Sequence, residues 1–180
     1  MTHLELPDPE RRRECAERAA VFPGMDERIK PLVGALWARG IPTVQSCEGH
    51  PDDFPHGVWY PWVYLGVDDL NVTAPARAWW PHAELRARGD REWTGPVQDL
   101  LYHFGDDVGW EDDEVFPMVL PLGGWGLAAL IPSGFGPGSP AHRLIGAALG
   151  VEGRREFHTC AWREFDLLTR WLNGETVTRA

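Results

Sequence analysis

Apolar positions recur along the chain at two spacings, one typical of helices and one typical of strands. Between residues 26 and 39 the apolar side chains share one helical face: Ile29, Val33, Leu36 and Trp37. Gly40 follows as a helix stop. The apolar, β-branched run at 41–46 predicts a strand, and the alternating run at 59–67 predicts a second one.

Two later apolar runs form the clearest hairpin pattern in the chain. Residues 115–122 and 125–131 are joined by Gly123-Gly124, a pair that can adopt positive φ. Pro117 and Pro121 place the first of these strands at a sheet edge or beside a bulge, because proline cannot donate to a ladder. Such an edge could pair with a second copy of the chain.

Capping residues and apolar spacing predict further helices. Asp8-Pro9 and Ser139-Pro140 each combine an N-cap side chain with proline at the first helical position. We expect helices over five ranges: 9–20, 74–88, 97–104, 139–149 and 159–172, with Gly150 ending the fourth and Thr159 capping the fifth. Interspersed helices and strands predict an α+β fold, with a small mixed or antiparallel sheet of about four strands and flanking helices.

Length and composition suit one domain over residues 1–180, with 1–22 as an N-terminal helical appendage. The net charge of −10 argues against nucleic acid as the main partner, since phosphate binding relies on clustered basic side chains. No apolar run is long enough for a membrane span, and no secretory leader is visible. Three widely spaced cysteines fit a reducing cytoplasm, which is the expected location.

The first predicted strand is followed by a polar turn, Ser46-Cys47-Glu48-Gly49-His50. Strand ends that enter glycine-containing turns often carry ligand-binding or reactive side chains. Gly49 permits a sharp bend where a Cβ would clash. Cys47 and His50 then lie three residues apart, within reach of one metal ion or of each other. This turn is the candidate site.

Three interpretations of the turn compete. In the structural one, Cys47 is a small core residue while Ser46, Glu48 and His50 bond the turn backbone. In the second, Cys47 and His50 form half of a zinc site that His158 and Cys160 complete. In the third, Cys47 is a catalytic nucleophile and His50 its base, because an imidazolium favours the thiolate.

Aromatic residues after the turn offer a wall for a ligand. Trp59 and Trp62 are the candidates, although their alternation with Val63 is also typical of a core. The expected function is therefore a binding module for a small molecule or a protein partner, with Ser46 and Glu48 as polar contacts. A metal-dependent or cysteine-dependent enzyme and a structural zinc site are the alternatives.

Two other segments could either bind an ion or serve as connecting loops. The acidic run at 106–114 could bind a cation, but its carboxylates fall in adjacent pairs unlike those of a calcium loop, which favours a solvated loop. The Gly/Pro segment at 133–140 could hold an anion ahead of a helix, yet it lacks the Lys-Ser/Thr pair of a phosphate loop.

The helix, the Gly-Ile-x-Thr strand start, Ser-Cys-x-Gly-His and the following strand resemble small bacterial and phage proteins of unknown function. The resemblance covers residues 29–67 and implies an α+β core without an established activity. The turn is also similar to the Ser-Cys-Ser-Gly-Arg stretch of wybutosine-synthesis methyltransferases. His50 replaces the arginine there, and no companion motif for S-adenosylmethionine accompanies it, so no catalytic residue is carried over.

Overall fold

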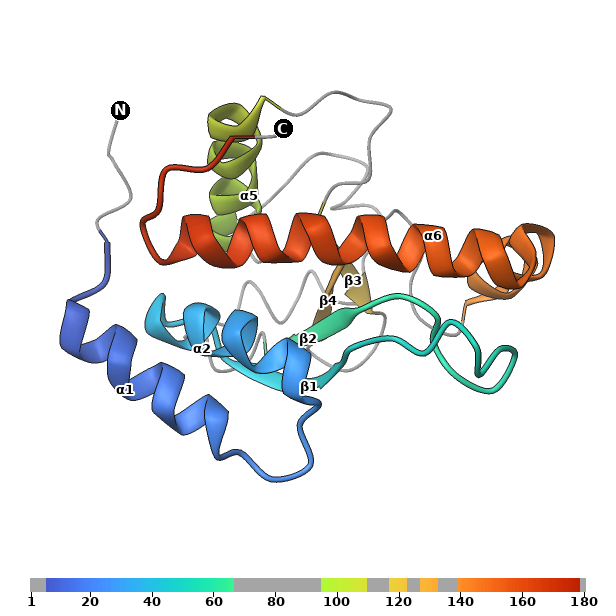
Figure 1. The fold of residues 1–180 in the computed structure, drawn as a ribbon. Helices are drawn as coiled ribbons and strands as arrows, with labels where there is room; N and C mark the ends of the chain where they lie inside the picture. Colours follow the sequence, from blue (N-terminus) through green and yellow to red (C-terminus); the bar gives the residue numbers. More distant parts are fainter. Residues whose placement is uncertain (1–5, 67–94, 110–116, 123–126, 133–138, 179–180) are drawn as a thin grey trace.

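A computed structural model describes residues 6–66, 95–109, 117–122, 127–132 and 139–178 (Figure 1). The N-terminal part contains helix α1 (Pro9–Ala20), the 3₁₀ helix η1 (Glu27–Ile29), helix α2 (Lys30–Ala38) and strands β1 (Thr43–Cys47) and β2 (Trp62–Gly66). The remainder contains helix α5 (Gly95–Val108), strands β3 (Met118–Leu122) and β4 (Leu127–Ile131), and the long helix α6 (Pro140–Leu172).

The strands form a four-stranded sheet in the order β1-β2-β4-β3, and each pair is antiparallel. The α+β fold predicted from the sequence is thus confirmed. The outer strands are β1 and β3, so Pro121 lies at an edge, where its missing N–H does least harm. In the β1–β2 ladder the register shifts between Thr43 and Gln45, which inserts Val44 as a bulge.

Local capping chemistry fixes the first helix as predicted. The Asp8 carboxylate accepts the backbone N–H of Glu10 at 2.7 Å and starts α1 beside Pro9. Asp26 precedes η1, and α2 continues from it with Pro31 in its first turn. The expected helix at 26–39 is therefore a short 3₁₀ turn followed by an α-helix.

Helix α6 confirms the predicted interruption at Gly150 but contradicts the predicted start of a second helix at Thr159. Two helices with a break between Gly150 and Thr159 were expected, whereas helical structure runs from Pro140 to Leu172 with one kink at Gly150 (φ 65°, ψ −174°). Gly150 combines a positive φ with an extended ψ, a conformation that is essentially restricted to glycine, and the helix resumes directly after it. The Thr159 hydroxyl donates to the carbonyl of Arg155 at 2.9 Å, inside the helix, so Thr159 is not a cap.

The two faces of the sheet carry separate cores. Cross-strand partners share a face, and Val63, Leu65 and Leu130 join the larger core with α2, α5 and α6. In Figure 1, α6 crosses the whole molecule above α2. The opposite face carries Trp62 and Ile131, which pack with residues of the 54–60 segment. The segment after β1 therefore contributes to the second core.

Several predicted features lie outside the described residues: the helix at 74–88, the Gly123-Gly124 turn, and the parts of the acidic and Gly/Pro segments at 110–114 and 133–138. Asp106 and Asp107, expected in an acidic loop, belong to the end of α5. Within the described ranges, none of the helices has the length and hydrophobicity that a membrane span requires.

Candidate functional site

The turn after β1 is as tight as the sequence predicts. Gly49 has a φ of 81°, and a Cβ at this position would lie 2.5 Å from the backbone carbon of Tyr60. Only glycine fits this close approach without strain. The turn therefore lies directly against the chain that leads into β2.

The backbone N–H groups of the turn are held by neighbouring groups. The Glu48 N–H donates to Oδ2 of Asp26 at 3.0 Å, and the Gly49 N–H donates to Sγ of Cys47 at 3.4 Å. The His50 N–H donates to the carbonyl of Val58 at 2.7 Å. Part of the structural interpretation is thus correct, but the carboxylate of Asp26, rather than the side chain of Ser46 or Glu48, accepts a backbone N–H of the turn.

Helix α6 holds the other side of the turn. The carbonyl of Glu48 lies 3.0 Å from Nε1 of Trp162 and 2.9 Å from Nε2 of His158. The Trp162 Nε1–H also lies 3.1 Å from Nε2 of His158, so the carbonyl, the indole and the imidazole form one polar cluster. The guanidinium of Arg28 lies over the Trp162 ring, 4.2 Å from the centroid. These contacts fix the turn between η1 and α6.

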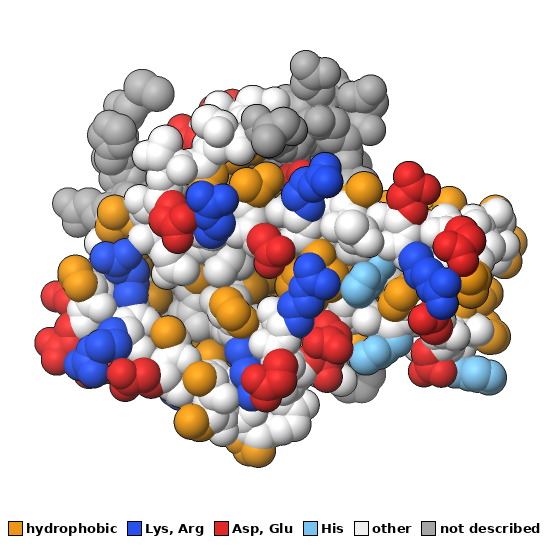
Figure 2. Space-filling model, viewed as in Figure 1, with side chains coloured by type: hydrophobic (Ala, Val, Ile, Leu, Met, Phe, Trp, Pro, Cys, Tyr) orange, Lys and Arg blue, Asp and Glu red, His pale blue; other side chains and the backbone are white. Residues whose placement is uncertain are grey.

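Three potential metal ligands converge at the turn. One carboxylate oxygen of Asp26, Sγ of Cys47 and a ring nitrogen of His50 all lie within 4.8 Å of one another. Asp26 and Cys47 are partly buried, whereas His50 is exposed. Figure 2 shows histidine and acidic side chains together on this face, between α6 and the segment that follows β1. The sequence analysis missed Asp26, since its only local signal is that of a helix start.

The electrostatics of the cluster disfavour a free thiolate. Burial raises the pKa of the Cys47 thiol, the charges of Asp26 and Glu48 raise it further, and the Gly49 hydrogen bond acts in the opposite direction. The expectation that His50 would lower this pKa therefore does not hold. A negatively charged setting of this kind suits a bound cation better than a nucleophilic sulfur.

The structure does not bring the four expected zinc ligands together. Neither His158 nor Cys160 belongs to the group of converging ligand atoms found in the described residues. The two lie two positions apart in α6, so their side chains point to different sides of the helix. Nε2 of His158 is also occupied by the Glu48 carbonyl.

The two tryptophans expected to wall a ligand site lie in the core. Trp59 is fully buried and stacks on His142, with the ring centroids 5.7 Å apart. Trp62 is 7% exposed and packs in the same core, where Cys47 lies against it. The alternation of these tryptophans with core residues therefore reflects core packing. Because Trp59 is fully buried, it cannot contact a ligand from solvent.

Ser46 lies on the other face of β1 from Cys47, as their partners Val63 and Trp62 on β2 indicate. It lines a separate pocket that does not include the converging ligands. Glu48 is partly buried, and its backbone rather than its side chain makes the contacts described above. The five-residue turn therefore borders both the cluster of converging ligand atoms and this pocket.

No protein-family model, no curated protein and no solved structure matches this chain. The inference of function therefore relies on the geometry of the site.

Proposed function

We propose that this protein binds a divalent metal ion, zinc by its donor set, through Asp26, Cys47 and His50. The observation that carries the proposal is the convergence of these three ligand atoms within 4.8 Å at the end of β1. Thiolate sulfur, imidazole nitrogen and carboxylate oxygen are the three donor types that zinc takes in proteins.

Three protein ligands are the number found in catalytic zinc sites, where the remaining position holds water or substrate. The exposure of His50 supports such an open position, because it leaves one side of the cluster accessible to solvent. A zinc-bound water has a pKa near neutrality, so the reaction class that suits the arrangement is metal-assisted attack of water. This proposal keeps the expected binding of a small molecule, which would enter at the open position of the metal.

The two competing interpretations have less support. A cysteine nucleophile needs a lowered pKa, whereas burial and the neighbouring carboxylates raise the pKa of Cys47. A structural zinc site needs a closed set of four ligands, and His158 is held by the Glu48 carbonyl instead.

The test is a titration of the full chain with Zn²⁺ in competition with a chromophoric chelator, and with Co²⁺, whose thiolate complexes absorb in the near ultraviolet. We expect one ion per chain and a cobalt–thiolate band. Cys47→Ser, His50→Gln and Asp26→Asn should each weaken binding by more than about 100-fold, because even indirect partners of a metal site change affinity about 10- to 100-fold.

Matched controls are available in the same chain. Cys160→Ser removes another partly buried thiol, and His56→Gln removes an exposed imidazole from the segment after the turn. Both should bind zinc as the wild type does. No stoichiometric binding, or equal loss in Cys47→Ser and Cys160→Ser, would refute the proposal.

A further inference from the structure

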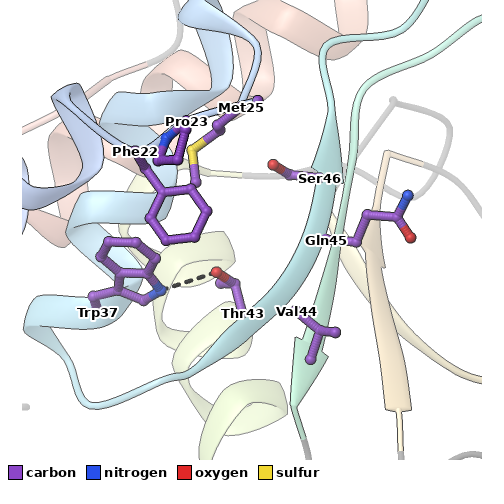
Figure 3. A pocket seen from close by; sticks show the side chains of 9 residues that line it. Phe22, Pro23, Met25, Trp37, Thr43, Val44, Gln45 and Ser46 are labelled. Carbon is purple, nitrogen blue, oxygen red and sulfur yellow. Dashed lines mark hydrogen bonds between the residues drawn. The ribbon is translucent and has the colours of Figure 1, made fainter.

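The free edge of β1 borders a pocket that the metal proposal does not use. The pocket lies between β1, the segment joining α1 to η1, and α2, and its volume is about 180 Å³. Its apolar wall is formed by Phe22, Met25 and Trp37 (Figure 3). The β1 wall is formed by residues 43–46.

The bulge in β1 shapes this wall. Because Val44 is inserted into the ladder, Thr43 and Ser46 both take partners, Leu65 and Val63, from the α2 side of the sheet. Figure 3 shows Thr43 and Ser46 on the side of β1 that faces Trp37 and Phe22. The Trp37 Nε1–H donates to Oγ1 of Thr43 at 2.9 Å, so the polar atom of the indole is satisfied within the wall.

The size and the surroundings of the pocket indicate what it accepts. Sites for drug-sized molecules and cofactors measure about 300–1,000 Å³, so this pocket suits a single side chain. Two of its lining residues are exposed apolar side chains, Val44 at 61% and Phe22 at 43%, and Val21, next to Phe22 in the sequence, is 80% exposed. Figure 2 shows hydrophobic side chains gathered along this lower border of the molecule.

The strand itself supplies the second half of a peptide site. β1 is the outermost strand, so its backbone groups on the side away from β2 have no ladder partner among the described residues. Such groups bind the backbone of an added strand, while a neighbouring pocket selects its side chain. A rigid small molecule would use the pocket but not the row of backbone groups.

We propose that the free edge of β1 binds an extended peptide segment of a partner protein, which adds a strand to the sheet and places one apolar side chain in the pocket between Phe22, Trp37 and Ser46. This inference does not depend on the metal site, because none of the three proposed ligands lines the pocket.

The test measures fluorescence anisotropy of labelled, end-blocked hexapeptides of threonine with one central variable residue, titrated with the full chain. Peptides with Leu or Phe at the centre should bind at least about tenfold more tightly than those with Ala or Glu, as expected for burying one large apolar side chain. N-methylation of alternate amides of the Leu peptide, on the edge that faces β1, should weaken binding by a similar factor.

A pair of tyrosine variants separates the pocket from the rest of the protein surface. Ser46→Tyr fills the pocket from its own wall and should weaken the Leu peptide at least tenfold. Ala148→Tyr places the same side chain at an exposed position of α6, away from the pocket, and should leave binding unchanged. Unfolding curves of both variants verify that the fold is retained.

Three results would overturn the proposal. One is equal binding, or none at 1 mM, for the Leu and Glu peptides. Another is unchanged binding after N-methylation, which would indicate a small-molecule pocket without strand addition. The third is a dimer in sedimentation that Ser46→Tyr dissociates and the Leu peptide does not, which would make a second copy of the chain the occupant.

Discussion

At the scale of single residues, Gly49 determines how closely the turn approaches the rest of the fold. Its positive φ and the backbone of Tyr60 both exclude a side chain. The close approach of Gly49 to Tyr60 also fixes the turn that carries Cys47 and His50. A change at Gly49 therefore acts on stability and on the proposed metal site together.

We expect Gly49→Ala to lower the free energy of unfolding by about 3 kcal/mol or more, because left-handed strain adds to a steric clash. Gly24 is the matched control, since its φ is 74° and a Cβ there would meet nothing within 4 Å. Gly24→Ala should therefore show only the strain, about 1–2 kcal/mol. Urea denaturation of both variants measures the difference, and equal losses would contradict the steric explanation.

Glu164 is a buried acid on α6 whose ionisation lowers the stability of the fold at higher pH. Burial raises its pKa from 4.5 to about 7, although the charge of Arg163 acts in the opposite direction. The folded chain therefore holds a proton that the unfolded chain has lost between about pH 4.5 and 7, so this group reduces stability as the pH rises through that window.

Glu164→Gln keeps the shape of the side chain and removes the ionisation. At pH 8 the variant should be more stable than the wild type, by up to about 3 kcal/mol for a pKa difference of this size. At pH 4 the advantage should vanish, because both forms are then neutral. Urea denaturation at the two pH values tests this, and an advantage that is independent of pH would rule it out.

At the scale of elements, Arg154 ties the kinked helix to the segment after the turn. Its Nε donates to the carbonyl of Pro51 at 2.9 Å, and its Nη1 donates to the carbonyl of Gly146 at 2.8 Å, on the other side of the kink. The guanidinium also lies 4.5 Å from the centroid of the Phe54 ring. One buried side chain thus joins both halves of α6 to the 51–54 segment.

Arg154→Met should lower the free energy of unfolding by about 2–4 kcal/mol, because two carbonyls lose a charged donor in a buried setting. The neighbouring Arg155 pairs with Asp52 at the surface, and Arg155→Met should leave stability close to that of the wild type. Hydrogen exchange should accelerate at residues 51–58 in the Arg154 variant alone. Equal acceleration in both variants would mean that Arg154 has no special role.

The features that the sequence could predict are those whose interacting residues lie close together in the chain. The caps at Asp8 and Ser139 and the glycine at position 49 act within a few residues, so their patterns predicted local structure correctly. Gly150 carried the pattern of a helix stop, but whether a helix resumes depends on packing against the sheet. The contact between Asp26 and Glu48 joins distant segments, and no local pattern predicts it.

At the scale of the whole molecule, the second core contains a titratable group with the opposite pH dependence to Glu164. His142 is 3% exposed, packs against Trp59 and Tyr60, and neither of its ring nitrogens has a hydrogen-bond partner in the described part of the chain. Burial, and then the charge of Arg143, lower its pKa below the ordinary 6.5. The unfolded chain therefore takes up the proton first, and stability falls as the pH drops below about 6.5.

Glu164 and His142 change the stability in opposite directions between pH 5.5 and 7.5. The pH dependence of the wild type alone therefore does not show the contribution of either group. The difference between wild type and His142→Phe isolates the histidine, since Glu164 contributes equally to both. The Phe ring keeps the stacking on Trp59, so the variant should gain stability over the wild type as the pH is lowered from 7.5 to 5.5. His103→Gln, at an exposed position of α5, serves as the control and should follow the wild-type curve. Parallel pH profiles for wild type and His142→Phe would mean that the second core accommodates the protonated imidazole, contrary to its burial between two aromatic rings.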